Sequence, residues 1–299
     1  MPSSDPLVSV CLPVRNGEKR LEPVVRSVLA QDHGELELVI SDNASTDGTE
    51  QLCRELARAD PRIVYHRQPE NIGLLNNFVA ATRLARGEFL RWIGDDDRIA
   101  PTYVSRCLEL FAADERLVLV TTQIDYAGDG GAQESAGYDG TALRSDDPVE
   151  RFVEWLRLLN QSYLLLDPLC GVVRRAVVVS VPRRNMLRED QIFAARLALA
   201  GPWGHVPAVL ARRGWKDETR TALARRLGVP VWQARVATAL QCRELLRLVS
   251  DADLEPAGRR RARAAVVQLY LGRHRRNLAN RSRRVAERAS RVVFTGKRP

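Results

Sequence analysis

The chain has 299 residues, of which 45% are hydrophobic and 28% are charged. This length suits one large α/β domain with an appendage or two modest domains, and the composition provides enough apolar residues for a buried core. No window approaches the roughly 20 consecutive apolar residues that a membrane-spanning helix needs, and the first residues lack the pattern of a signal peptide. The sequence therefore disfavours an integral membrane protein, and we expect a cytoplasmic one.

The five cysteines and the distribution of charge further restrict the class of protein. The cysteines are odd in number and never in C-x-x-C spacing, which predicts reduced core residues instead of disulfides or a zinc site. They are Cys11, Cys53, Cys107, Cys170 and Cys242. Residues 257–299 contain 14 basic residues and one acidic residue, so the net charge of +9 becomes −4 without them. The basic character belongs to this tail alone.

Short β-branched or apolar runs alternate with amphipathic stretches in the first half, which is typical of βα units on a largely parallel sheet. The predicted strands are residues 7–14, 35–42, 62–67 and 88–94, and the predicted helices are 17–31, 47–59 and 74–86. Asp47 is expected to cap the second helix.

The second half is predicted in the same way. The pattern indicates a helix over 101–113, a strand over 117–127, a mobile glycine-rich loop over 127–140, a helix near 146–160, strand and turn over 164–179, and a helix over 188–201. Residues 202–215 end the first domain. Residues 216–299 are expected to form an α-helical, Arg-rich extension, with helices at 230–249 and 258–277.

Polar residues follow three of the predicted strands: Arg15 and Asn16, then Asp42 and Asn43, then the run 95–97. Because ligands bind outside the carboxyl ends of strands in an open α/β sheet, these ends should meet at one crevice. At an effective dielectric constant of 20, two carboxylates about 4 Å apart repel by about 4 kcal/mol. The acidic run therefore needs nearby arginines or a divalent cation.

Five motifs appear in order along residues 7–210: VSVCLPVRNGEKRLEPVVRSVLAQ, LELVISDNASTDGT, the N-x-G of ENIGLLNNF, ARGEFLRWIGDDDRIAP and REDQIFAARLALAG. In this series the chain resembles the family 2 glycosyltransferases, which are inverting nucleotide-sugar enzymes of the GT-A fold. The resemblance implies a GT-A domain over 1–215, with a Rossmann-like, mostly parallel sheet flanked by helices.

The resemblance also implies where the nucleotide binds. Asp42 would contact the base or ribose, and the first strand end would form a wall beside it. The residues implied in the nucleotide-sugar site are Pro13, Val14, Arg15, Asn16, Asp42 and Asn71, with Asp95, Asp96 and Glu189. Without the resemblance, Asp42 reads as a turn residue or helix cap.

The family commonly carries D-x-D-D before the proline that is Pro101 here, and in this sequence Gly94 stands at its first aspartate. Asp96 and Asp97 then take the paired positions. One of them would ligate Mg²⁺ or Mn²⁺, which suit an all-oxygen site, and the other would contact the ribose. A reading of Asp95 to Asp97 as D-x-D stays open, as does a solvated acidic turn paired with Arg91 or Arg98.

An inverting transferase needs one general base, and in the family this is the aspartate of an E-D pair at the start of a helix. Here the pair is Glu189 and Asp190, so Asp190 is the predicted base and Glu189 would shape the acceptor pocket. The alternative is that both acids only favour the helix N-terminus. Arg196, Arg212, Arg213 and Trp215 are weaker candidates for contacting the diphosphate or sugar, and His205 is expected to be a packed residue.

The partners follow from these assignments. The donor would be a UDP, dTDP or GDP sugar, and the acceptor a hydroxyl of a saccharide, lipid carrier or small metabolite in polysaccharide or glycoconjugate synthesis. The basic tail could lie on an anionic membrane at its inner face or be a solvated helix; nucleic-acid binding is disfavoured because no reading motif accompanies it. A nucleotidyltransferase, or an inactive binding protein with this tail, is the alternative function.

Overall fold

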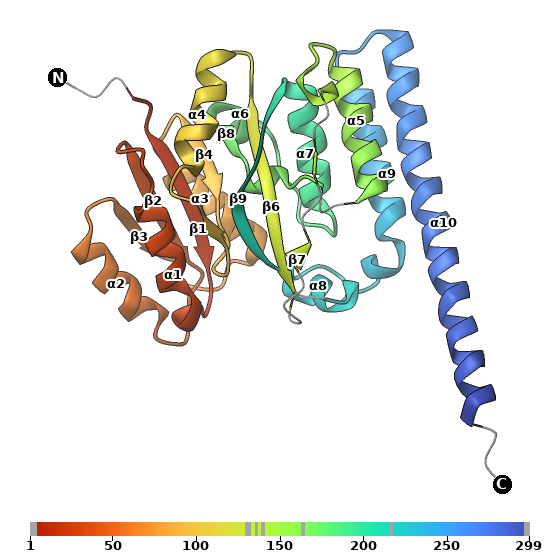
Figure 1. The fold of residues 1–299 in the computed structure, drawn as a ribbon, viewed down its shortest axis with the longest axis horizontal. Coiled ribbons are helices and arrows are strands. Elements are labelled where there is room, and N and C mark those ends of the chain that lie inside the picture. The colour runs from red at the N-terminus through yellow and green to blue at the C-terminus, as the bar shows by residue number, and fades with distance from the viewer. Residues whose placement is uncertain are drawn as a thin grey trace.

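Strands and helices alternate along the first half of the computed structural model, which describes residues 5–128, 133–134, 137–138, 141–162, 165–215 and 218–295. The elements are β1 (Val8–Val14), α1 (Glu18–Leu29), β2 (Leu36–Asp42), α2 (Thr49–Ala59), β3 (Ile63–Arg67), α3 (Leu74–Leu84), β4 (Phe89–Trp92), β5 (Arg98–Ile99) and α4 (Tyr103–Ala113) (Figure 1). The predicted βα alternation is confirmed.

The second half supplies the remaining strands and the helical layer. Its elements are β6 (Leu119–Gly128), β7 (Gln133–Glu134), η1 (Ala142–Arg144), α5 (Pro148–Gln161), η2 (Pro168–Cys170), β8 (Val172–Arg174), α6 (Arg175–Ser180), α7 (Glu189–Ala200), β9 (Trp203–Trp215), α8 (Arg220–Arg226), α9 (Gln233–Asp251) and α10 (Pro256–Thr295). The predicted α/β class is therefore confirmed.

The strands form one mixed sheet with the order β3-β2-β1-β4-β8-β6-β9-β5, and β7 pairs with β6. β1 lies parallel to β2 and β4, and β2 lies parallel to β3. β5 pairs antiparallel with β9, matching Arg98 to Arg212. The acidic run 95–97 thus connects β4, in the middle of the sheet, to the edge strand β5, which pairs with the end of β9.

Every residue of β1 and β2 is buried because helices cover both faces of the sheet. Val10 and Leu12 of β1 belong to a cluster with α1 and α4, whereas Cys11 belongs to the cluster that contains α5 and α7. This alternation follows from the two-residue period of a strand. The five cysteines are buried and free, as predicted.

Of the helices after residue 218, α10 packs on α5 and α9, α9 packs on α7, and α8 packs on α9. Leu245 of α9 and Leu269 of α10 share one hydrophobic cluster with Phe152 and Trp203, and the last turns of α10 extend beyond the other elements (Figure 1). Among the helices of the described residues, none is long and apolar enough to cross a bilayer. The boundary between 1–215 and 216–299 stays a prediction.

Two local predictions need correction. In the described part of the span expected as strand and turn, 165–179, a strand forms only at Val172–Arg174, and Arg175–Ser180 is helical. β-Branched residues favour strands only where partners exist, and the pairing with β4 ends where Phe89 meets Arg174. The loop expected over 127–140 contains strand residues Gln133–Glu134, while 129–132, 135–136 and 139–140 lie outside the described residues.

Candidate functional site

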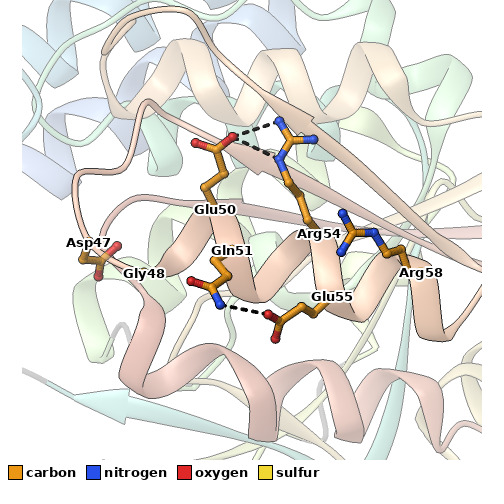
Figure 2. A pocket seen from close by; sticks show the side chains of 7 residues that line it. All are labelled: Asp47, Gly48, Glu50, Gln51, Arg54, Glu55 and Arg58. Carbon is orange, nitrogen blue, oxygen red and sulfur yellow. Dashed lines mark hydrogen bonds and ion pairs between the residues drawn. The ribbon is translucent and has the colours of Figure 1, made fainter.

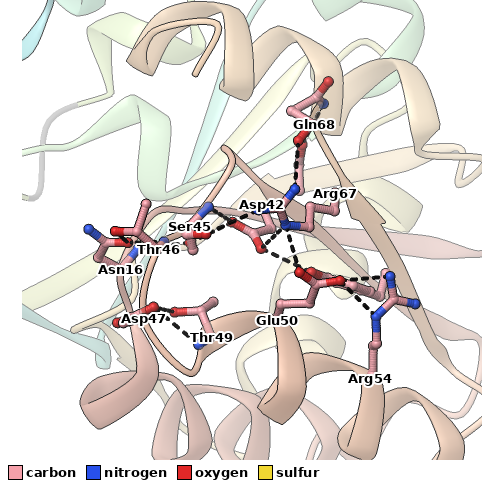
Figure 3. A network of polar contacts seen from close by, with 12 residues as sticks. Asn16, Asp42, Ser45, Thr46, Asp47, Thr49, Glu50, Arg54, Arg67 and Gln68 are labelled. Atoms are coloured by element: carbon pink, nitrogen blue, oxygen red, sulfur yellow. Dashed lines mark hydrogen bonds and ion pairs between the residues drawn. The ribbon is translucent and has the colours of Figure 1, made fainter. Parts of the chain in front are cut away.

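Asp42 ends β2 in a fully buried position and organises the turn that follows it (Figure 3). Its Oδ1 accepts hydrogen bonds from the backbone N–H and the hydroxyl of Ser45, and its Oδ2 accepts one from the Tyr65 hydroxyl at 2.9 Å. Arg67 Nε lies 3.8 Å from the same Oδ2. The carboxylate therefore already has several donors, and its contact with a nucleotide stays a prediction.

The end of β1 is tied to this turn by Asn16. Its backbone N–H donates to Ser45 Oγ at 2.9 Å, and its Oδ1 accepts from the backbone N–H of Thr46 at 2.9 Å (Figure 3). Pro13 and Val14 are buried, whereas Arg15 and Asn16 are exposed. Of the predicted wall, Arg15 and Asn16 are thus the side chains that a ligand can reach.

Asn71 joins the same region from the loop before α3. Its Oδ1 accepts from Asn43 Nδ2 at 2.8 Å, and Asn43 Oδ1 accepts from the backbone N–H of Ile72 at 2.8 Å. Asn43 is buried and Asn71 is exposed. The N-x-G segment is therefore held beside the end of β2.

Asp95 is paired with an arginine that the sequence did not single out. Arg20, in the first turns of α1, donates from Nε to Asp95 Oδ2 at 3.1 Å and from its terminal nitrogen to the same oxygen. A β-carbon on Gly17 would lie 3.4 Å from that oxygen. The acidic run thus begins directly above the end of β1, as the strand-end argument predicted. Arg91, an alternative partner, is instead buried against the ring of Tyr103.

Asp97 is buried, and only one of its oxygens is satisfied within the described residues. Oδ2 accepts from the backbone N–H of Gly94 at 2.8 Å, whereas Oδ1 has no hydrogen-bond partner. A β-carbon on Gly94 would lie 3.1 Å from Asp97 Oδ2 and 3.3 Å from Asp96 Oδ1. Both carboxylates therefore fold back over Gly94 and lie close together.

These residues fit a divalent cation of the Mg²⁺ type. A buried carboxylate oxygen without a hydrogen bond is costly, and such a cation takes one or two carboxylates together with substrate phosphates and water. The described residues contain no group of three or more His, Cys, Asp or Glu side chains that would hold a metal by themselves. Two carboxylates would leave the remaining positions around such a cation to water or to a phosphorylated ligand.

The end of β9 brings a basic residue to the acidic run. Arg213 is paired with Asp167, and its Nε lies 4.0 Å from Asp97 Oδ1. The neighbouring Arg212 pairs with Arg98 in the sheet, and the side chain of Trp215 lies outside the described part. Asp167 was missed from the sequence because it precedes a short 3-10 helix and belongs to no motif.

Glu189 and Asp190 occupy the first turn of α7 but have different surroundings. Glu189 accepts two hydrogen bonds from Arg183, at 2.7 and 2.6 Å, and both side chains are largely buried. The Arg183 guanidinium also lies over the rings of Trp92 and Phe193. Because Trp92 is the last residue of β4, the start of α7 packs beside the strand that leads into the acidic run.

Asp190 is exposed to solvent, yet its pKa is raised. Desolvation by the surrounding protein is the main cause, and the negative charge of Glu189 adds to it. A reachable carboxylate with a raised pKa is suited to general-base chemistry.

Three described residues other than glycine have a left-handed backbone: Asn16, Ala44 and Arg188, with φ of 54°, 53° and 65°. Asn16 is itself a predicted site residue, Ala44 follows Asp42 by two positions, and Arg188 directly precedes Glu189. Such conformations cost free energy and persist where surrounding contacts impose them. All three mark the turns that aim the candidate residues.

Two pockets flank these residues. One of about 420 Å³ is lined by α2 and the turn before it, where Glu50 pairs with Arg54 and Gln51 with Glu55 (Figure 2); it includes none of the aspartates 95–97. The other, of about 280 Å³, is lined by Arg183, Glu189, Arg196 and Glu244, among others. Glu189 and Arg196 therefore face a pocket between α7 and α9.

His205 is a packed residue, as expected. Its Nδ1 lies 3.0 Å from Thr121 Oγ1, and its ring meets that of Tyr138 edge to face at 5.3 Å. Burial lowers the pKa of His205 to about 4. The imidazole is therefore neutral at pH 7.

The sequence is also similar to known proteins. It is 33% identical to the abequosyltransferase RfbV of Salmonella typhimurium over 37% of this chain and 36% of that protein. It is 26% identical to the putative glycosyltransferase EpsH of Bacillus subtilis over 64% of this chain and 55% of that one. The chain thus spans between about a third and about half of the length of these relatives.

The fold is similar to solved structures. S. aureus TarS 1–349 in complex with UDP-GlcNAc superposes with a TM-score of 0.63 at 19% identity, covering 88% of this chain and 72% of that one. The mannosyltransferase PcManGT of Pyrobaculum calidifontis, in complex with GDP-Man and Mn²⁺, gives 0.58 at 17% identity, covering 100% and 83%. The model of the family described as "Glycosyl transferase family 2" matches residues 9–162, just over half of the sequence. The chain therefore belongs to glycosyl transferase family 2.

Proposed function

We propose that this chain is an inverting glycosyltransferase that moves a sugar from a nucleoside-diphosphate donor to an acceptor hydroxyl. The observation that carries this proposal is the placement of Asp95 to Asp97. The run lies where the ends of β1, β4 and β9 meet, and a buried oxygen of Asp97 has no hydrogen bond there among the described residues.

The donor nucleotide would lie against the exposed Arg15 and Asn16, with the backbone of Pro13 and Val14 behind them. Asp42 would support this wall, because its hydrogen bonds hold the turn at Ser45 and the hydroxyl of Tyr65 in place. Asn71, fixed by Asn43, would border the same wall. Because similar solved structures contain UDP-GlcNAc and GDP-Man, UDP and GDP are the first nucleoside diphosphates to test, and dTDP is tested in parallel.

Asp97, together with Asp96, would hold Mg²⁺ or Mn²⁺ beside the donor. When bound, the cation would neutralise charge on the departing diphosphate. Arg213 lies on the same side and would add a fixed positive charge, since Asp167 holds its guanidinium in place. Arg20 keeps the Asp95 carboxylate turned toward α1.

Asp190 would take the proton from the acceptor hydroxyl while that oxygen attacks the anomeric carbon opposite the leaving group. Its raised pKa makes it a stronger base than an ordinary aspartate. Glu189 cannot share this role easily, because Arg183 occupies both of its oxygens. Instead it would form one wall of the acceptor pocket.

Calorimetric titration of the full chain with UDP, dTDP and GDP, each with and without Mn²⁺, tests the proposal. We expect one diphosphate to bind, and Mn²⁺ to strengthen its binding. Binding of none of the three would reject the function, and equal affinity with and without Mn²⁺ would reject the metal. Tight binding of a nucleoside triphosphate alone would favour a nucleotidyltransferase.

A further inference from the structure

The inward face of α10 changes character along its length. Residues 262, 266 and 269 are fully or almost fully buried apolar side chains, and their three- and four-residue spacing defines the face that packs on the protein. Continuing that spacing leads to Arg273 and Arg276. Two arginines thus occupy positions where the packing pattern would place apolar residues.

Arg273 reaches a pair of glutamines under the helix. It donates to Gln241 Oε1 of α9 and, at 2.8 Å, to Gln191 Oε1 of α7. Gln241 is fully buried, and its Nε2 donates to Gln191 Oε1 at 2.9 Å. Arg188, just before α7, donates to the same Gln241 Oε1 at 3.1 Å. Two guanidinium groups therefore converge on one amide oxygen.

A third guanidinium lies on the same face. Arg276 donates to the backbone oxygen of Asn160 and to its Oδ1 at 2.8 Å. Helix α10 comes close to α5 here, because a β-carbon on Gly272 would lie 2.9 Å from Asn160 Oδ1. Arg188, Arg273 and Arg276, which we call the arginine cluster, thus lie where α5, α7, α9 and α10 meet.

The charge of Asp190 acts on two members of the arginine cluster, but within the described residues no carboxylate forms an ion pair with them. Within the described residues, none of its three guanidinium groups has a carboxylate oxygen within 4.0 Å; their hydrogen bonds go to amide and backbone oxygens. Desolvation, with repulsion from Arg220 and Arg276, lowers the pKa of Arg188 to about 10. Desolvation, with repulsion from Arg188 and Arg276, lowers the pKa of Arg273 to about 9. Clustering like charges without a counter-ion is unfavourable, so the arrangement is one that an anion would stabilise.

The cluster borders the proposed catalytic base. Arg188 and Gln191 flank the Glu189 and Asp190 pair in the sequence, and the charge of Asp190 acts on both Arg188 and Arg273. Arg188 and Arg273 are partly exposed and Arg276 is exposed, so a ligand can reach them. An anion held here would lie close to Asp190.

We propose that the arginine cluster binds a phosphate group of the acceptor and so places the acceptor hydroxyl at Asp190. Guanidinium forks match the geometry of phosphate oxygens, and three positive charges suit a dianion better than a single carboxylate. This inference rests on the proposed glycosyl transfer and deepens it by assigning the class of acceptor.

The test uses the full chain saturated with whichever of UDP, dTDP and GDP binds most tightly, so that the donor site is filled. Inorganic phosphate is then titrated at low ionic strength. We expect Arg273→Gln to weaken phosphate binding about tenfold or more, because a charged hydrogen bond is lost, and Arg276→Gln, which is exposed and should not affect folding, to weaken it in the same direction.

Arg275→Gln is the matched control, since it removes an exposed charge from the neighbouring turn position of α10. Equal losses for Arg273→Gln and Arg275→Gln, or no phosphate binding by the parent chain, would overturn the proposal. So would a lower melting temperature for Arg273→Gln with unchanged phosphate affinity, because that result indicates a purely structural cluster.

Two competitors separate the possible sources of the phosphate. Displacement of inorganic phosphate equally well by glycerol 3-phosphate and farnesyl phosphate supports a water-soluble phosphorylated acceptor, and a clear preference for farnesyl phosphate supports a lipid-linked one. Displacement by neither, or equally strong displacement by acetate, contradicts the acceptor site. Should no nucleotide bind, the glycosyl transfer fails separately, while phosphate binding at the cluster can still be measured without nucleotide.

Discussion

Gly214 of β9 lies so close to Asp96 that a β-carbon on it would approach Asp96 Oδ2 to 2.7 Å and Cγ to 3.0 Å. These residues are more than one hundred positions apart in the sequence, yet β9 closes directly over the acidic run. The β-carbon of Asp96 would lie only 3.4 Å from a β-carbon added to Gly214. This close approach therefore restricts where the Asp96 carboxylate can point.

Gly214→Ala should therefore displace the Asp96 carboxylate and weaken binding of the nucleoside diphosphate in the presence of Mn²⁺. Overpacking of this kind costs about 1–3 kcal/mol, so we expect a fall in affinity of about tenfold with little loss of secondary structure. Titration calorimetry measures the affinity, and circular dichroism measures the secondary structure. Gly34→Ala is the control, because nothing lies within 4 Å of its added β-carbon; similar affinities for both variants would exclude a role for this contact.

Asp190→Asn should lower the rate of sugar transfer by about 10²- to 10⁴-fold, the usual contribution of a positioned general base. Affinity for the nucleoside diphosphate should stay within about twofold, because the base contacts the acceptor. Steady-state kinetics and calorimetry provide the two readings. Asp146→Asn, which removes an exposed carboxylate paired with Arg116, should leave both unchanged; an Asp190→Asn protein with full turnover would show that another group is the base.

The pH dependence of transfer should report the raised pKa of Asp190. The base must be deprotonated, so activity should fall as the pH drops through that pKa, at a higher pH than for an ordinary aspartate near 3.9. Glu189→Gln removes a neighbouring negative charge and should move this acid limb to lower pH. Profiles of kcat/KM against pH for the parent chain and for Glu189→Gln test this. A shift of the acid limb to higher pH in Glu189→Gln would contradict the assignment of Asp190 as the base.

His205 should make the fold sensitive to acid. Its pKa is about 4 in the folded protein and about 6.5 when unfolded, so the unfolded chain binds a proton more readily in that interval. Stability is then complete above pH 6.5 and decreases as the pH falls toward 4, by up to about 3 kcal/mol.

Urea unfolding at pH 7.5 and pH 5 measures this loss. The difference between the two pH values should be smaller for His205→Gln than for the parent chain. His66→Gln, at an exposed histidine, should retain the full difference, and an undiminished difference in His205→Gln would assign the acid sensitivity to other groups.

The strand ends and the acidic run that follows β4 could be predicted from the sequence, because hydrophobic periodicity and turn residues are local signals. The role of the E-D pair was implied only by the resemblance to the glycosyltransferase family. The same local signals located β1 to β4 and α1 to α3. They failed at Arg175–Ser180, where β-branched residues form a helix because the sheet offers no further partner.

Partners across the sheet could be decided only by the tertiary structure. Asp95 meets Arg20, Asp97 faces Arg213, and Glu189 is held by Arg183, although arginine is abundant and no local pattern distinguishes these three. The arginine cluster likewise exists only because α7, α9 and α10 pack together. Sequence periodicity determines which face of an element is buried, but the choice of ion partner depends on distances between elements that only packing establishes.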